Sequence, residues 1–429
     1  MTRARRRSIA ALGTLIAGAS TTPAMAQEIR LTGPLAGSSG PTRNRLFFDA
    51  GDYVSTSRFV GLLQLGLVQA HAGTFVGLAR VAPKTATYGS HAGVVDLAFV
   101  SARDDAFAGA LLVSTWRARS EHFVGLVELA PFASTRRFDG VAQVGLFNDV
   151  ASMDDGSCPY VALAQLGGLN RDACMVAALR LGLYNASSAT FHGGLDLGVV
   201  NRTQRFEGVA EVGVVNVGRD AARDVVTLSL ANLGARDFAG VAELGVFTWN
   251  ARSFEGVVEA GVVNLAGSNW SGVVQIGVLN EVGDATSRAL FSGRREIDFR
   301  QERDFSFHGL LQLGVGNALD SSFYGVAEIA LGINHARDDF RGLVQIAGVV
   351  DWTERDAFGL GLVAPLNVVG RDFSGLAMAG AVNVATSVHG AQIGLVNVAR
   401  ELHGVQLGVV NVGGPRALAA VLPVVNVGL

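Results

Sequence analysis

Apolar and polar positions recur along most of the chain in units of about sixteen residues, with the same order of residue types in each unit. The unit reads aromatic-x-Gly-Val-x-[Glu/Gln]-φ-Gly-φ-φ-Asn, where φ is apolar; residues 206–216 (FEGVAEVGVVN) and 254–264 (FEGVVEAGVVN) are two clear copies. Repetition at this spacing is typical of solenoids and arrays. Within a copy the alternation has a period of two, which predicts β-strands rather than helices.

The same alternation predicts which side chains share a side of the strand. In the copy at residues 206–216 it places Val209, Glu211 and Val215 on one side, with Gly213 between them. Columns of exposed apolar residues, such as those containing Val209 and Val215, would then run along the repeats. Large apolar surfaces of this kind usually mark an interface.

The first Gly of each unit marks the register of the repeats. It predicts about twenty-two copies of 14–17 residues in an array over residues 59–429, in which three copies are degenerate at Ala162, Ala177 and Asp224. Two long polar tails, at residues 149–159 and 281–306, predict surface loops. Residues 27–58 would form an N-terminal lead-in or cap.

The first 26 residues have the pattern of a signal peptide. A run of arginines precedes an apolar stretch from Ile9 to about Ala19, and Ala24-Met25-Ala26 supplies small residues for cleavage before Gln27. We therefore expect an exported protein, at the outer membrane or cell surface or in the periplasm.

The repeat predicts an all-β fold, with a β-solenoid as the first interpretation. Each repeat would be one coil, and equivalent residues would form columns about 4.8 Å apart. Sixteen residues suit two short strands and two corners around a thin core of Gly, Ala and Val, with Gly213 at a corner because Gly tolerates positive φ. Stacking also predicts an asparagine ladder and an aromatic column: Asn148, Asn201, Asn216, Asn264 and Asn280; Phe206, Phe238, Phe254 and Trp270.

The alternative is a large antiparallel transmembrane β-barrel with one strand per repeat. Ten to eleven patterned residues match the length of a membrane strand, about 9–11 residues, and Glu or Gln would face the lumen. However, such barrels alternate short and long connections, and the tails of these repeats do not.

The polar position of the unit supplies specific pairs. Arg180 comes one repeat before Asp196, as Arg80 does before Asp96, so both would be stacked partners. Glu243 comes one repeat before Glu259, and this like-charge pair is tolerable where it faces water.

The two cysteines, Cys158 and Cys174, also lie one repeat apart. Residues one coil apart are within disulfide reach in a solenoid, whereas a barrel would carry them to opposite membrane faces. We expect a disulfide after export into an oxidising space.

Two family resemblances follow from the short copies near the C-terminus. GAQIGLVN at residues 390–397 and GVQLGVVN at residues 404–411 resemble the G-[LV]-Q-[LI]-G-[LV]-V-N unit of bacterial surface-repeat proteins. QIGLVNVA at residues 392–399 is similar to the curlin repeat Q-x-G-x-x-N-x-A. The first resemblance implies an envelope or surface protein without catalytic residues, and the second implies coils that stack.

Composition narrows the function classes. The net charge is −3, and removal of a leader with four Arg and no acidic residue would make it −3 − 4 = −7, which argues against a nucleic-acid partner. The eight His are scattered, with no HExxH or Cys/His spacing for a metal, and we expect no catalytic, cofactor or metal site. The sequence predicts a structural, adhesive or self-associating envelope protein, whose partners are other copies, envelope components or a membrane. The alternative is an outer-membrane pore or transporter-like protein.

Overall fold

The computed structural model describes residues 28–31, 43–151, 158–283, 306–415 and 417–428, in which the regular structure is β-strand. The chain divides into two compact units, Met1–Trp116 and Arg117–Leu429. The predicted signal peptide at residues 1–26 lies outside the described residues, as do the central parts of the two expected surface loops.

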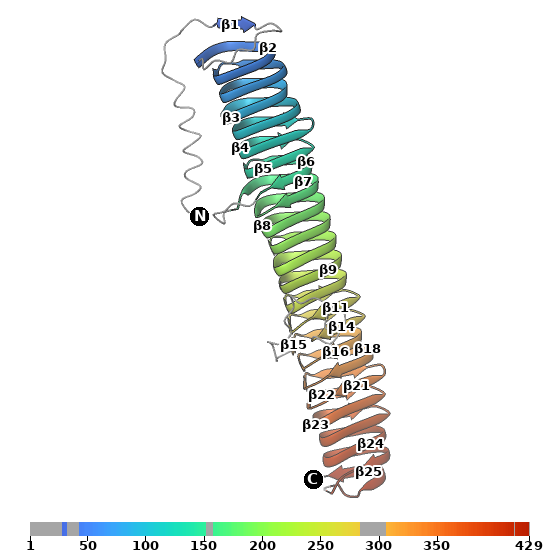
Figure 1. The fold of residues 1–429 in the computed structure, drawn as a ribbon. Helices are drawn as coiled ribbons and strands as arrows, with labels where there is room; N and C mark the ends of the chain where they lie inside the picture. The colour runs from blue at the N-terminus through green and yellow to red at the C-terminus, as the bar shows by residue number, and fades with distance from the viewer. Residues whose placement is uncertain (1–27, 32–42, 152–157, 284–305, 416, 429) are drawn as a thin grey trace, which may run out of the picture. The chain divides into compact units, whose positions relative to one another are not determined.

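The strands of the second unit pair in parallel, one repeat apart. β10 (Val258–Ala260) pairs with β13 (Val274–Ile276), and β11 (Val263–Ala266) pairs with β14 (Leu279–Val282). Each coil therefore lies on the next, with equivalent residues side by side (Figure 1). This is the predicted β-solenoid, whereas the barrel alternative required antiparallel neighbours.

Each full coil has three strands, not the two that we expected. In one coil these are β10, β11 and β12 (Asn269–Ser271), separated by bends at residues 256–257, 261–262 and 267–268. Burial shows the reason, because Phe254, Glu259 and Asn264 point inward at intervals of five residues. Side chains alternate between inward and outward for about three residues along each side of the coil. The alternation is then interrupted at a corner and starts again on the next side.

We name the three sides of the second unit by these strands. The apolar face contains β10 and β13, the asparagine face contains β11 and β14, and the aromatic face contains β12 and β15 (Ser306–His308). Elsewhere one strand often covers more than one side: β4 (Arg117–Leu129), β5 (Phe132–Asp139), β6 (Ala142–Val150), β7 (Tyr160–Asp172), β8 (Met175–Glu207), β9 (Ala210–Glu255), β16 (Leu311–Leu319), β17 (Ser322–Tyr324), β18 (Ala327–Ala336), β19 (Phe340–Arg341), β20 (Val344–Ala347), β21 (Val350–Thr353), β22 (Ala357–Val363), β23 (Leu366–Ala379) and β24 (Val382–Val412).

The first unit is also built from parallel strands. β1 (Glu28–Leu31) pairs with β2 (Arg43–Val60), and β2 pairs with β3 (Leu63–Ser114) from Phe48↔Leu63 to Val60↔Val76. The coil register thus extends back to Phe48, inside the segment that we expected to be a lead-in.

The last coil is covered by a strand of opposite direction. β25 (Val421–Gly428) pairs antiparallel with the end of β24, from Gly404↔Gly428 to Val412↔Val421. This pairing satisfies backbone groups that would otherwise form a free sheet edge at the end of the stack.

Candidate interaction surface

The interior of the second unit is built from stacked columns, one of which is aromatic. Phe206 stacks on Phe191, and Phe254 stacks between Phe238 and Trp270 with ring centroids 5.0 and 5.2 Å away. Ala222 takes the aromatic position opposite Phe206, so the column is interrupted before Phe238. The core therefore contains rings and polar side chains as well as the small apolar residues that we expected, such as Ala266 and Val282.

The predicted asparagines form a buried ladder of side-chain amides. Asn264 Nδ2 donates to Asn280 Oδ1 at 2.8 Å and also to the backbone oxygen of Ile276 at 2.7 Å. Asn148, Asn201 and Asn216 lie in the same ladder. Sequence reasoning named only these five, although an Asn seven to nine residues after the first residue of the coil identifies further members: Asn170, Asn185, Asn232, Asn317, Asn334, Asn367, Asn383, Asn397 and Asn411.

The repeat glycines are required because buried side chains leave no room for a Cβ at these positions. Gly213 is at a corner, but its φ is not positive, contrary to our expectation. A Cβ on Gly213 would collide with Asn216 Oδ1, and a Cβ on Gly208 would lie 2.6 Å from Phe206 Cζ. One glycine of the repeat thus makes room for the amide ladder and the other for the aromatic column.

The third column is polar and faces inward, so its like-charge pair, Glu243 and Glu259, does not face the water that would make it tolerable. Gln143 Nε2 donates to Glu128 Oε2 at 2.9 Å, and Gln165 Nε2 donates to Gln143 Oε1 at 3.0 Å. Glu243 and Glu259 are adjacent and buried. Burial, followed by the charge of Glu259, raises the pKa of Glu243, while burial raises the pKa of Glu259. Protonation of either carboxyl would remove the like-charge repulsion that the sequence implied.

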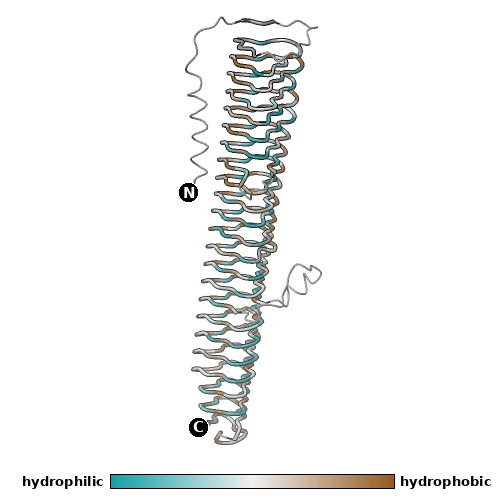
Figure 2. The backbone as a smooth tube through the Cα atoms, turned by 60° about the vertical axis from the view of Figure 1, so that its left-hand side comes forward, coloured by the Kyte–Doolittle hydropathy of each residue, from teal (hydrophilic) through white to brown (hydrophobic). Residues whose placement is uncertain are grey.

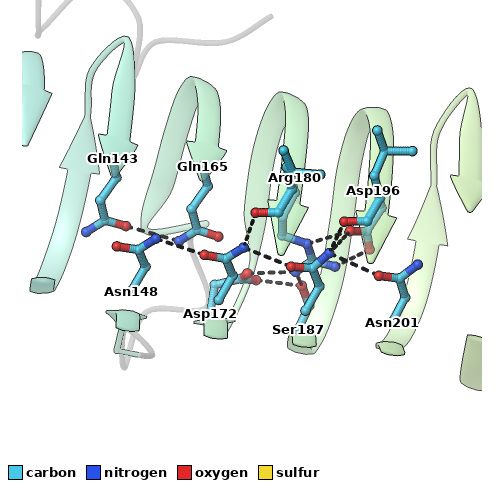
Figure 3. Close-up of polar contacts among 12 residues, drawn as sticks. Gln143, Asn148, Gln165, Asp172, Arg180, Ser187, Asp196 and Asn201 are labelled. Atoms are coloured by element: carbon cyan, nitrogen blue, oxygen red, sulfur yellow. Dashed lines mark hydrogen bonds and ion pairs between the residues drawn. The ribbon is translucent and has the colours of Figure 1, made fainter. Parts of the chain in front are cut away.

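The two predicted Arg–Asp pairs are buried ion clusters. Arg180 Nε donates to Asp196 Oδ1 at 3.0 Å and Arg180 Nη1 donates to Asp172 Oδ2 at 2.9 Å, so one guanidinium lies between two carboxylates (Figure 3). Ser187 Oγ donates to Asp172 Oδ1 at 2.6 Å. In the first unit Arg80 contacts Asp96 and a second carboxylate in the same way.

Cys158 and Cys174 form the predicted disulfide, with their Cα atoms 4.7 Å apart. The bond joins the residues just before β7 and β8, which are neighbouring coils. The disulfide therefore links two adjacent coils covalently.

Two groups of side chains have suitable donor atoms and spacing for a metal ion. The donor atoms of His91, Asp96 and Asp104 lie within 4.8 Å of one another, as do those of a second group, Cys158, Cys174 and His192. In the first group both carboxylates pair with Arg80. In the second the disulfide removes both thiolates. We assign no metal to either.

The outer surface of the apolar face contains no charged side chain in the described coils of the second unit. From the repeat glycine (position 0), positions 1, 2, 4 and 6 carry Val, Leu, Ile, Ala, Gly or Pro in the first fifteen coils, and the ionisable residues occur at position 3, which points inward. In the last two coils, which are shorter, the buried residue is Gln392 or Gln406 at position 2. Asp224 at position 0 is buried. The seventeen coils begin at Gly125, Gly140, Ala162, Ala177, Gly193, Gly208, Asp224, Gly240, Gly256, Gly272, Gly309, Gly325, Gly342, Gly359, Gly375, Gly390 and Gly404.

Two corner columns make this face ridged. Val262 and Val278 are 45% and 50% exposed, and Val209, on the other corner, is 53% exposed. Val215, which we expected to be in an exposed column, is only partly exposed because it lies beyond the corner on the asparagine face. Figure 2 shows hydrophobic and hydrophilic segments within each coil of the unit.

The outer surface of the aromatic face has charged and polar side chains together with exposed apolar ones such as Val161 and Phe358. Arg341 lies over the rings of Tyr324 and Phe358, and its Nη2 pairs with Asp339 at 3.1 Å. A shallow depression of about 530 Å³ is lined by Arg341, Phe358 and the adjacent glycines. The unit is therefore amphipathic across its section, with charges gathered away from the apolar face.

Comparison with protein-family models, curated proteins and solved structures finds no significant match to this chain. Within the described residues there is no helix with the length and apolar character needed to cross a membrane. The fold and the surfaces define Arg117–Leu429 as a β-solenoid whose described coils have one uncharged outer face.

Proposed function

We propose that this chain is a non-enzymatic, exported protein of the cell envelope or cell surface, with a structural role and an adhesive or self-associating surface. The observation that supports this proposal is the apolar face of seventeen coils. Parallel sheets usually have both faces covered, and exposed apolar patches above a few hundred Å² mark interaction sites.

The polar interior supports a structural role for the residues that might otherwise suggest chemistry. The Gln and Asn side chains recur coil after coil and bond to their equivalents in the next coil, as Gln406 does to Gln392 and Asn397 does to Asn411. Such repetition stabilises stacked strands. The leader pattern and the disulfide support export, because disulfides persist in oxidising compartments.

Expression of the tagged full-length chain in a bacterial host tests this proposal. We expect cleavage before Gln27, an oxidised Cys158–Cys174 pair, and recovery in the envelope fraction. A chain lacking residues 1–26 is the control and should stay in the cytoplasm. An uncleaved, reduced, cytoplasmic full-length chain would contradict the proposal.

A further inference from the structure

We infer that the apolar face of Arg117–Leu429 is a homotypic interface, in which the same face of a second copy packs against it. This inference rests on the proposed function and names the partner of its surface. It is carried by the repeat spacing, the area and the charge distribution of that face.

The repeat spacing favours a second copy as the occupant. The corner residues Val262 and Val278 lie on adjacent coils. The residues that follow them in sequence, Val263 and Leu279, are paired directly in the sheet. Equivalent corner residues of adjacent coils are therefore about 4.8 Å apart along the stack. A second copy has columns with the same spacing, so ridges of one face can fit the grooves of the other along the stack, as packed sheet faces do at about 10 Å separation.

The area of the face is sufficient for a stable dimer. Five residue steps separate the corner positions 1 and 6, which gives a width of roughly 16 Å at about 3.3 Å per residue. Because adjacent coils are about 4.8 Å apart, one coil contributes roughly 80 Å² to the area of the face. Seventeen coils contribute roughly 1,300 Å². Standard interfaces bury about 800 Å² per partner, so a little more than half of the face would be enough.

The charge distribution argues against an anionic membrane as the occupant. Membrane-surface segments use Lys and Arg to hold anionic headgroups. In the coils that the structure describes, the apolar face has neither on its outer side, and the whole chain has a net charge of −3. Two uncharged faces of this kind meet without repulsion and without burying an unpaired charge.

The test is the mass of the purified mature protein in solution, measured by light scattering and sedimentation across a range of concentrations. We expect a dimer for the unaltered chain. Val262→Arg with Val278→Arg places two charges on adjacent coils of the face and should weaken dimerisation by about a hundredfold or more, because each charge would be buried without a partner.

The matched control is Ser271→Arg with His308→Arg. These residues are also exposed, lie on adjacent coils and add the same charge, but they are on the aromatic face, so the dimer should persist. If the double Arg variant loses its β-sheet circular dichroism, Val262→Thr with Val278→Thr keeps the side-chain shape and should still weaken the dimer.

Two results would overturn the inference: a wild-type chain that is monomeric at every concentration, or face variants that dimerise as the wild type does. Vesicles of neutral and of anionic phospholipid separate the outcomes. A monomer that binds vesicles through Val262 and Val278 would contradict the second copy and leave the proposed envelope function standing. A face-dependent dimer that is never exported would contradict the function and leave the interface standing.

Discussion

Arg180 shows how one residue determines the stability of its coil. Its guanidinium is fully buried between Asp172 and Asp196. Removing one partner of a buried ion pair costs about 3–5 kcal/mol, because a charge is left uncompensated. Arg180→Met should therefore destabilise the surrounding coils by about that amount, although Met fits the column, where Met378 is fully buried.

Hydrogen exchange of the amides in β7 and β8 measures this effect locally, which is necessary because a repeat array need not unfold in one step. Adding Asp172→Asn and Asp196→Asn to Arg180→Met removes the two carboxylates that have lost their partner. The triple variant should therefore recover part of the lost stability. Unchanged protection in Arg180→Met would show that the ion cluster contributes little.

Val424 is a second single-residue case, at the C-terminal end. It is a β-branched residue with φ of 69° and is 70% exposed. Such a conformation strains a side chain with a branched Cβ, whereas Gly adopts it freely. Val424→Gly should stabilise β25 by about 1 kcal/mol, measured as slower amide exchange in that strand.

The control for this change is Val425→Gly, in the same strand but without positive φ. It should destabilise β25, since glycine weakens a regular strand. Faster exchange in both variants would mean that the strain at Val424 is not significant.

At the scale of strands, the disulfide is the clearest test. Cys158 and Cys174 are separated by 16 residues, and closing a loop of that size stabilises a fold by about 3 kcal/mol. Replacing both with Ser should lower the thermal midpoint of unfolding, and reductant should lower that of the wild type equally while leaving the variant unchanged. Alkylation of both thiols in the native, unreduced protein would contradict the bond.

The strand layout shows where sequence reasoning succeeded and where it stopped. Parallel stacking could be predicted because Cys158 and Cys174, and Arg180 and Asp196, lie one repeat apart. The third strand was missed because a period of two was read across a corner. The signal was present: Phe206, Glu211 and Asn216 are five residues apart, the spacing at which each side of the coil turns one residue inward.

For the whole molecule, the apolar face could be located from the sequence only after the inward position was known. A strict period of two places Val209 and Glu211 on the same side of the strand. The charged residue therefore interrupts the predicted apolar column. The structure turns Glu211 inward and Val209 outward, and the remaining outer positions are then uncharged. What covers such a face lies outside the chain, so the partner could be inferred only from the spacing, area and charge of the face once it was folded.

The buried carboxyls give the whole molecule an unusual dependence on pH. Burial, with a smaller effect of Asp351, raises the pKa of Glu328 from 4.5 to about 8, and burial raises the pKa of Asp351 to about 7 and of Asp224 to about 6. Below their ordinary pKa values these groups are protonated in both states. As pH rises from about 4 to 8, the unfolded chain releases protons that the folded chain retains, so stability falls.

We therefore expect the highest unfolding midpoint near pH 4–5 and a decline toward pH 8, the range bounded by these shifts. Glu328→Gln tests the cause, because Gln312 and Gln345 hold the same position in the adjacent coils. Gln resembles the protonated acid, so this variant should gain stability at pH 8, gain little at pH 5 and show a shallower decline. Glu354→Gln, at an exposed site, is the control and should leave the slope unchanged. A midpoint that rises between pH 5 and 8 would mean that these carboxyls are ionised inside the fold.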